Sequence, residues 1–225
     1  MSIILNIETS TTNCSVSLSK KGETLVLKED NNRNYSHAEL LHTFIDDVLK
    51  TAQIDKSQID AIAVSKGPGS YTGLRIGVSA AKGLCYALEK PLISISTLHA
   101  LARQVEIKDG FIVPMLDARR MEVYSAIYDF EFNLLRKIEA QILDPSSFNQ
   151  LLEKGKVVFV GNGTEKTKAI IDHQNAFFID DKLPSANEMG KLAYEKYKIG
   201  DTEDVAYFEP FYLKDFIALK PKTKS

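Results

Sequence analysis

The architecture of this chain follows from Gly67-Pro68-Gly69-Ser70-Tyr71-Thr72-Gly73-Leu74-Arg75-Ile76-Gly77. The run comes after an apolar segment at residues 59–64 and predicts a strand, a glycine turn and a helix that continues to about residue 88. Gly67 and Gly69 supply the backbone freedom that a sharp turn needs. Since the first amides of a helix have no partner within it, the turn is a candidate anion site.

The helix predicted after this turn has a small and apolar surface. From residue 72 to residue 88 the only charged side chains are Arg75 and Lys82. Small residues form one face at Gly73, Gly77, Ala80 and Ala81 and a second face at Ser79, Gly83 and Ala87. A helix with so little polar surface is normally buried nearly all round. Two interpretations stay open: both faces pack inside the chain, or another protein covers the second.

Length and composition indicate one large domain or two small ones, because 225 residues with 44% hydrophobic content can bury a core without a disulfide or a metal. Cys14 and Cys85 are expected to be buried thiols in a reducing cytosol. We find no signal peptide and no apolar run of about 18 residues that could span a membrane, so we expect a cytoplasmic protein. The net charge of −2 and the scattered basic residues argue against tight nucleic-acid binding by the chain alone.

The order of predicted elements repeats. The first half has strands at residues 3–7, 14–19, 24–28 and 59–64 and helices at 36–52 and 71–88; the second has strands at 111–116, 121–128, 134–140 and 157–160, a helix from about 145 to 153 and a glycine turn at 161–163. Such self-similarity predicts two α/β subdomains of like fold, residues 1–108 and 109–225. The order resembles the duplicated, ribonuclease H-like subdomains of the actin, Hsp70 and hexokinase superfamily, which binds ATP between its halves.

Five motifs are more specific than this pattern. They resemble, in order and spacing over essentially the whole chain, the bacterial TsaB (YeaZ) family: Glu8-Thr9-Ser10, Ser36-His37-Ala38-Glu39, the run at residues 67–77, Asp117-Ala118-Arg119 and Pro210-Phe211-Tyr212-Leu213-Lys214. The resemblance implies a non-catalytic partner in the synthesis of N6-threonylcarbamoyladenosine at position 37 of tRNA. In that system the paralogue TsaD holds the metal and transfers the threonylcarbamoyl group, and the ATPase TsaE joins the complex.

The resemblance also implies which residues bind the partner. TsaB proteins pair with TsaD through the first two helices of the N-terminal half, here residues 36–52 and 71–88. The expected partner-binding residues are His37, Leu41, Phe44, Val48, Tyr71, Gly73, Leu74, Gly77, Ala80 and Ala81. Without TsaD, the same apolar face is expected to pair two copies into a homodimer. Contact with tRNA is expected only through the complex.

Nucleotide binding by the chain itself remains a weaker hypothesis. The candidate residues are Glu8, Ser10, Gly67, Gly69, Asp117, Arg119, Gly161 and Gly163. Residues 8–13 lack the glycine of a kinase phosphate hairpin, and neither glycine turn has the lysine and hydroxyl pair of a Walker loop. We therefore expect no cofactor of the chain's own, with ATP or ADP at a partner interface or in TsaD, and a structural or partner role for Glu8.

Two enzyme classes remain as alternatives. The first is an ATP-dependent small-molecule kinase of the same superfamily, with Glu8 and Asp117 in its cleft. The second, a glycoprotease-like peptidase, needs a metal or a nucleophile. Residue 41, four positions after His37, is leucine, and His42 lies about 100° away around the helix. No histidine near a serine or cysteine in the sequence forms a recognisable nucleophile and base pair, so we expect no metal site and no hydrolysis.

Overall fold

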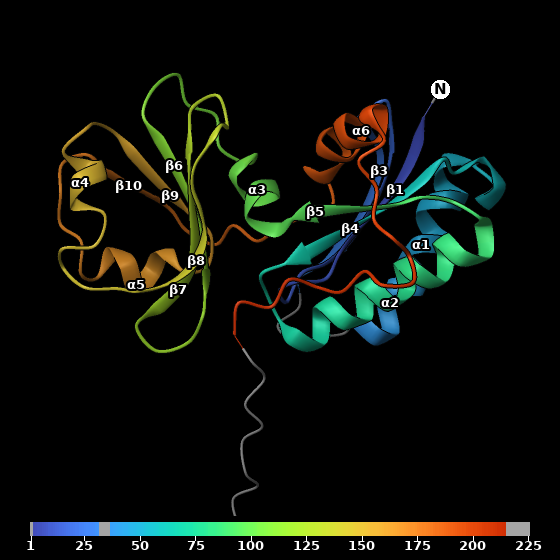
Figure 1. Cartoon of the computed structure of the whole chain (residues 1–225), viewed down its shortest axis with the longest axis horizontal. Helices are drawn as coiled ribbons and strands as arrows, with labels where there is room; N and C mark the ends of the chain where they lie inside the picture. The colour runs from blue at the N-terminus through green and yellow to red at the C-terminus, as the bar shows by residue number, and fades with distance from the viewer. Residues whose placement is uncertain (1, 32–36, 215–225) are drawn as a thin grey trace, which may run out of the picture.

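The computed structural model describes residues 2–31 and 37–214, which form two lobes side by side (Figure 1). Each lobe contains a five-stranded mixed sheet. The first sheet has the order β3-β2-β1-β4-β5 and comprises β1 (Ile3–Glu8), β2 (Cys14–Lys20), β3 (Glu23–Asp30), β4 (Ala61–Gly67) and β5 (Leu92–Ser96). The second has the order β8-β7-β6-β9-β10 and comprises β6 (Phe111–Asp117), β7 (Glu122–Asp129), β8 (Leu134–Ile142), β9 (Val157–Val160) and β10 (Ala176–Ile179).

The two sheets have the same topology. β1 pairs antiparallel with β2 and parallel with β4, and β6 pairs antiparallel with β7 and parallel with β9. The predicted fold class, a duplicated actin-like α/β fold, is confirmed. Ser36, where the first helix was predicted to begin, lies outside the described residues.

The helices differ between the lobes. α1 (His37–Ala52) and α2 (Tyr71–Leu88) are long, whereas α3 (Thr97–Ala102), α4 (Asn149–Leu152) and α5 (Thr164–Lys168) are short; α6 (Met189–Ile199) is the last helix, and a 3-10 turn covers Lys56–Gln58. Across residues 2–31 and 37–214, none of these helices combines the length and the hydropathy needed to cross a bilayer.

Side chains alternate between the two faces of the first sheet, so its strands contribute to two hydrophobic cores. On β1, Leu5 and Ile7 pack with Leu41 and Val48 of α1, and also with α2. Ile4, from the opposite face, belongs to the core beneath α6. Figure 1 shows α1 and α2 on one side of this sheet and α6 on the other.

The last helix of each half packs on the sheet of the other half. Met189 and Leu192 of α6 belong to the core of the first lobe, and Ser17 Oγ donates a hydrogen bond to the carbonyl of Ala186 at 2.7 Å. Conversely, Leu98 and Leu101 of α3 belong to the core of the second lobe. Packing therefore does not follow the predicted division at residues 1–108 and 109–225 at these two helices: α6 packs on the first sheet, and α3 packs on both cores, since its Ala100 belongs to the first. A repeated order of elements does not reveal on which sheet a helix packs.

Glycines of α2 permit close contact with the end of β1. A Cβ at Gly73 would collide with the carbonyl oxygen of Thr9, and one at Gly77 would collide with Thr9 Oγ1. Thr9 Oγ1 also donates to the carbonyl of Gly73 at 2.8 Å. By contrast, a Cβ at Gly83 would meet no atom within 4 Å. The first small face of α2 is thus internal, and the second is open.

Candidate docking face and inter-lobe cleft

Seven of the ten predicted partner-binding residues lie inside the chain's own core. The buried residues are His37, Leu41, Val48, Gly73, Leu74, Gly77 and Ala81. These residues pack between the two helices and the first sheet and are closed to solvent in the chain alone, so a partner that docks on this surface would meet their exposed neighbours first. A contact surface and a core produce the same apolar pattern in the sequence of a helix.

His37 illustrates the difference. Its Nε2 lies 2.7 Å from the carbonyl oxygen of Thr11, so the imidazole joins the start of α1 to the loop after β1. Burial lowers the pKa of His37. A neutral histidine in this position serves the fold of the lobe.

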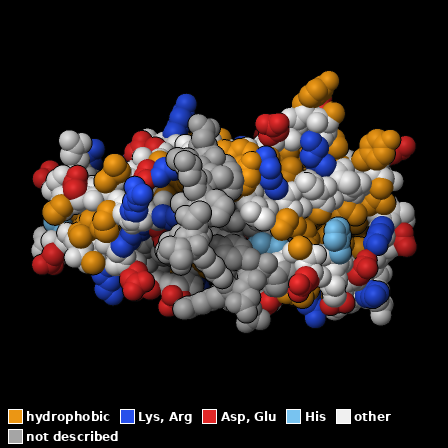
Figure 2. All heavy atoms as spheres, turned by 90° about the horizontal axis from the view of Figure 1, so that it is seen from below, with side chains coloured by type: hydrophobic (Ala, Val, Ile, Leu, Met, Phe, Trp, Pro, Cys, Tyr) orange, Lys and Arg blue, Asp and Glu red, His pale blue; other side chains and the backbone are white. Residues whose placement is uncertain are grey.

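The other three predicted residues, Phe44, Tyr71 and Ala80, are partly exposed. Tyr71 lines the cleft described below. Phe44 and Ala80 belong to what we call the docking face, the outer surface of α1 and α2: Leu40, Phe44, Ile76, Ser79, Ala80, Gly83, Leu84, Tyr86 and Ala87. Tyr86 is 85% exposed. Hydrophobic side chains spread over this side of the N-terminal lobe (Figure 2). Ser79, Gly83, Tyr86 and Ala87 were absent from the predicted set, although their spacing along the helix was already visible in the sequence.

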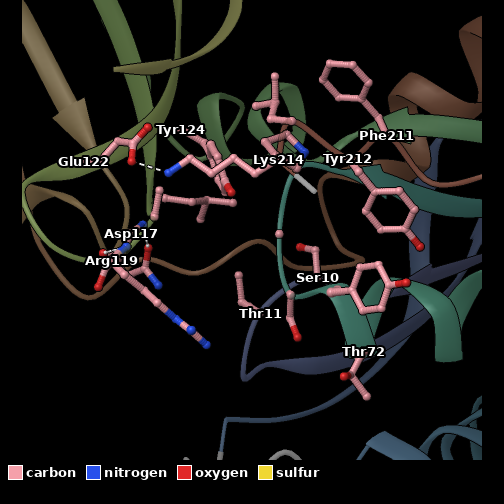
Figure 3. Close-up of a pocket in the computed structure, with 18 of the residues that line it drawn as sticks. Ser10, Thr11, Thr72, Asp117, Arg119, Glu122, Tyr124, Phe211, Tyr212 and Lys214 are labelled. Atoms are coloured by element: carbon pink, nitrogen blue, oxygen red, sulfur yellow. Dashed lines mark hydrogen bonds and ion pairs between the residues drawn. The ribbon is translucent and has the colours of Figure 1, made fainter. Parts of the chain in front are cut away.

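A cleft of about 540 Å³ separates the lobes. Its walls are residues 10–12, residues 68–72, the β6–β7 connection, Asn162 and residues 211–214 (Figure 3). Of the predicted nucleotide-binding residues, Ser10, Gly69, Asp117 and Arg119 line this cleft. The other four, Glu8, Gly67, Gly161 and Gly163, do not line it.

The three glycines outside the cleft serve internal packing. Gly67 has a φ of 111° and lies against the carbonyl of Phe211, and Gly161 has a φ of 120° and lies against the carbonyl of Met115. Gly163 faces Val123. These contacts leave no room for a side chain at the turns, which accounts for glycine there without a phosphate.

Glu8 lies beneath the cleft and is fully buried. Its Oε1 accepts hydrogen bonds from Ser10 N at 2.6 Å and from Ser65 Oγ at 2.9 Å, whereas Oε2 has no hydrogen-bond partner among the described residues. Burial raises the pKa of the Glu8 carboxyl, because the charged form is poorly solvated there. The arrangement ties the ends of β1 and β4 together.

The turn at Gly69 and Ser70, the part of the cleft wall where a kinase would bind the phosphates of ATP, packs against Ser10 of the loop after β1. Ser70 N donates to the carbonyl oxygen of Ser10 at 2.6 Å, and a Cβ at Gly69 would collide with that oxygen. Ser70 Oγ caps α2 by accepting from Gly73 N at 3.2 Å. A kinase needs open amides at this turn for the phosphates of ATP, so the local geometry does not favour the kinase alternative.

The acidic residues of the cleft are already paired with lysines. Lys166 Nζ lies 2.5 Å from Asp117 Oδ1 and also donates to the carbonyl of Arg120 at 2.8 Å. Lys214 forms an ion pair with Glu122. Asp117 further accepts from Arg119 N at 2.7 Å, which shapes the turn between β6 and β7.

Residues 203–214 form a segment that we call the strap. It begins at the edge strand β5, where Glu203 N donates to the carbonyl of Leu92 at 2.8 Å. It then runs along α2, where Lys82 Nζ donates to the carbonyls of Ala206 and Phe208 at 3.0 and 3.1 Å. The sequence motif at residues 210–214 was noted for its resemblance, but no structural role was predicted for it.

The end of the strap spans the cleft. Phe211 N donates to the carbonyl of Lys66 at 2.7 Å, and the rings of Tyr71 and Tyr212 are 4.9 Å apart. Lys214 then reaches Glu122 on β7 of the other lobe. The strap thus contacts both lobes.

The histidines are dispersed. His99 stacks on Tyr128 at 5.1 Å between ring centroids, and burial and Arg103 lower the pKa of His99 to about 4. His173 Nδ1 accepts from Asn175 N at 3.1 Å. Within residues 2–31 and 37–214, no three His, Cys, Asp or Glu side chains are grouped as metal ligands would be.

Comparison with known proteins gives consistent matches over both lobes. The family model described as "TsaD: tRNA N6-adenosine threonylcarbamoyltransferase" matches residues 31–222. The tRNA threonylcarbamoyladenosine biosynthesis protein TsaB of Escherichia coli (strain K12) is 32% identical over 226 residues, which cover 96% of this chain and 96% of that protein. TsaB of Bacillus subtilis (strain 168) is 31% identical over 219 residues, covering 94% and 93%. The solved structure "YeaZ from Pseudomonas aeruginosa" has a TM-score of 0.84 at 28% identity, covering 95% of this chain and 100% of that one.

Proposed function

This chain belongs to the TsaB (YeaZ) family and takes part in tRNA threonylcarbamoyladenosine biosynthesis, and we propose that it acts there as a non-catalytic subunit. In this proposal its docking face binds a TsaD-type paralogue, which carries the catalytic site, and a TsaE-type ATPase joins them. The complex works in the cytoplasm on tRNA.

The observation that supports the proposal is the open second face of α2. Ser79, Gly83 and Ala87 are exposed, and they lie beside half-buried apolar residues of α1 and α2 that continue into the core. Small residues allow the backbone of a partner helix to come close, and an apolar surface in water favours burial. The occupied amides of Ser70 and Gly73 argue in the same direction, because they are not open to the phosphates of a nucleotide.

The test uses Gly83, because this position is open and the fold does not depend on it. The variant Gly83→Glu places a charge in the centre of the docking face and improves helix propensity. We expect association with the paralogue from the same organism to weaken at least about tenfold, which corresponds to about 1.4 kcal/mol. Isothermal titration calorimetry gives the affinity, and thermal melting followed by circular dichroism confirms that the variant folds.

Two control variants complete this test. Gly83→Ala changes helix propensity without adding charge or much bulk and is expected to bind the paralogue like the wild type. Ala140→Glu adds the same charge to an exposed position of β8 in the other lobe. If Gly83→Glu binds as tightly as these controls, the docking face is wrongly assigned.

In the absence of the paralogue, we propose that two copies of the chain pair through the same face. Light scattering after size exclusion is then expected to give the mass of a dimer for the wild type and of a monomer for Gly83→Glu. A wild-type monomer at high concentration would remove the homodimer from the proposal and leave the paralogue contact to be judged by calorimetry.

A further inference from the structure

We propose that the mouth of the inter-lobe cleft binds single-stranded RNA, with Arg119 and Arg120 contacting phosphates and aromatic rings of the cleft contacting bases. The choice of RNA as ligand rests on the proposed function in tRNA modification. The site itself is separate from the docking face and is a property of this chain alone.

The backbone of the β6–β7 turn is left-handed at two consecutive arginines. Arg119 and Arg120 have φ values of 68° and 52°, so two consecutive residues with long side chains adopt the left-handed conformation. Turns of this kind favour Asn-Gly and similar pairs, because a Cβ is disfavoured there. Such strain persists mainly where function requires the residue, so the pair calls for an explanation outside the fold.

Among the described residues, the arginine side chains carry the unpaired charge at the β6–β7 turn. Asp117 is paired with Lys166 and Glu122 with Lys214, so the acidic groups beside the turn are already neutralised. The side chains of Arg119 and Arg120 are exposed and have neither an ion pair nor a hydrogen bond to another residue within the described ranges. In a chain with a net charge of −2, the cleft mouth is therefore locally positive. Figure 3 shows the Arg119 side chain extending into the space between the lobes.

Aromatic rings line the cleft from both lobes. Tyr71 and Tyr212 lie with ring centroids 4.9 Å apart, Tyr124 lines the second lobe, and Phe211 is 41% exposed. Unpaired bases stack on such rings, and guanidinium groups hold the intervening phosphates. A cleft of about 540 Å³ is of the size that holds nucleotide-like groups but is too narrow for a duplex. The combination favours a single strand over an acidic peptide, which has no use for the aromatic wall.

The experiment measures fluorescence anisotropy of a labelled anticodon stem-loop and of an unstructured oligoribonucleotide with the full chain. We expect weak binding that falls with salt, with a slope of log K against log [salt] near −1.4 if two phosphates are contacted, at about 0.7 per phosphate. Arg119→Gln and Arg120→Gln are each expected to reduce the slope by about 0.7. The matched control is Lys137→Gln, which removes an exposed positive charge from β8 and is expected to leave the slope unchanged.

A second variant separates binding from folding. Arg120→Gly relieves the left-handed conformation, so its melting temperature is expected to rise while RNA affinity falls. A higher melting temperature together with a lower RNA affinity would show that Arg120 serves binding at a cost in stability. If the melting temperature and the affinity both fall, the arginine serves the fold and the proposal is wrong.

Three other outcomes would overturn the proposal: no wild-type binding at low salt, binding by both glutamine variants with the affinity and salt dependence of the wild type, or competition by ATP or polyglutamate at the same phosphate or carboxylate concentration as the RNA. The assay uses the chain alone, so it does not depend on the docking face. Paralogue binding without RNA binding would remove only this inference, and RNA binding without paralogue binding would remove only the docking proposal.

Discussion

The two lobes share a strand order but differ in what surrounds it. The first sheet carries α1 and α2 on one face and α6 on the other, whereas the second carries only short helices, α3, α4 and α5. The strands that open each half also end differently: Glu8 is buried and bonded under the cleft, and Asp117 is exposed beside two free arginines. The duplicated sheet is thus covered by long helices with an exposed apolar surface in one lobe and has a charged cleft edge in the other.

The largest effect is expected within α2, which has one glycine packed against Thr9 and another where a Cβ would contact nothing among the described residues. Gly73→Ala places a Cβ against the carbonyl of Thr9, so we expect a loss of about 1–3 kcal/mol or more in the free energy of unfolding. Gly83→Ala meets no atom and is expected to gain about 0.5–1 kcal/mol. Urea denaturation measures both. Equal effects of the two substitutions would contradict the division of α2 into an internal and an open face.

The dependence of the first lobe on α6 is tested at Ser17. Its Oγ donates to the carbonyl of Ala186 and accepts from Asn6 Nδ2 at 3.0 Å, all within a buried seam. Ser17→Ala removes the donor to the buried Ala186 carbonyl and is expected to cost about 1–3 kcal/mol, whereas Asn6 Nδ2 keeps its hydrogen bond to Ser19 Oγ. Hydrogen exchange should show faster exchange in α6 and not in α4. Uniform acceleration over both lobes would speak against α6 as a part of the first lobe.

The buried acidic residue at the end of β1 is expected to make the stability of the protein depend on pH. Burial raises the pKa of Glu8 in the folded state, so the folded protein resists losing this proton. The protonated Glu8 carboxyl therefore contributes its whole stabilisation of the fold below the ordinary pKa of a glutamate. This contribution is lost as the pH rises through the higher pKa of Glu8 in the folded protein. Glu8→Gln removes this loss, and its free energy of unfolding is expected to fall less than that of the wild type between pH 4 and pH 7. Parallel pH profiles for the two proteins would show that Glu8 is not protonated in the fold.

The smallest effect is expected where the strap joins the lobes. The Lys214 and Glu122 side chains are 39% and 22% exposed, so the pair is worth about 0–1 kcal/mol and weakens with salt. Lys214→Ala and Glu122→Ala, alone and together, form a double-mutant cycle measured by thermal melting at low and high salt. A coupling energy that does not decrease in high salt would indicate a contact other than an ion pair.

Sequence patterns predicted the strands and the long helices well, because alternation and helical periodicity report the local backbone directly. They did not distinguish Leu41 and Val48, which are core, from Gly83 and Tyr86, which are exposed, since a helix with little polar surface does not show which of its residues face the core of its own chain. The exchange of α3 and α6 between lobes depends on contacts that are distant in sequence. Arg119 was among the predicted nucleotide-binding residues, but that its side chain has no ion pair within the described residues could not be predicted, because only the structure shows that Lys166 and Lys214 pair with Asp117 and Glu122.

The return of α6 to the first sheet also sets an order of completion during synthesis on the ribosome. Residues 97–183 contain every strand and most of the helical cover of the second lobe in one continuous stretch, so that lobe has its core as soon as these residues have emerged. The first lobe, although translated earlier, exposes Ile4, Ala63 and Ile93 until Met189 and Leu192 arrive. Domains generally fold as their residues become available. The lobe that is made first is therefore the one that is finished last.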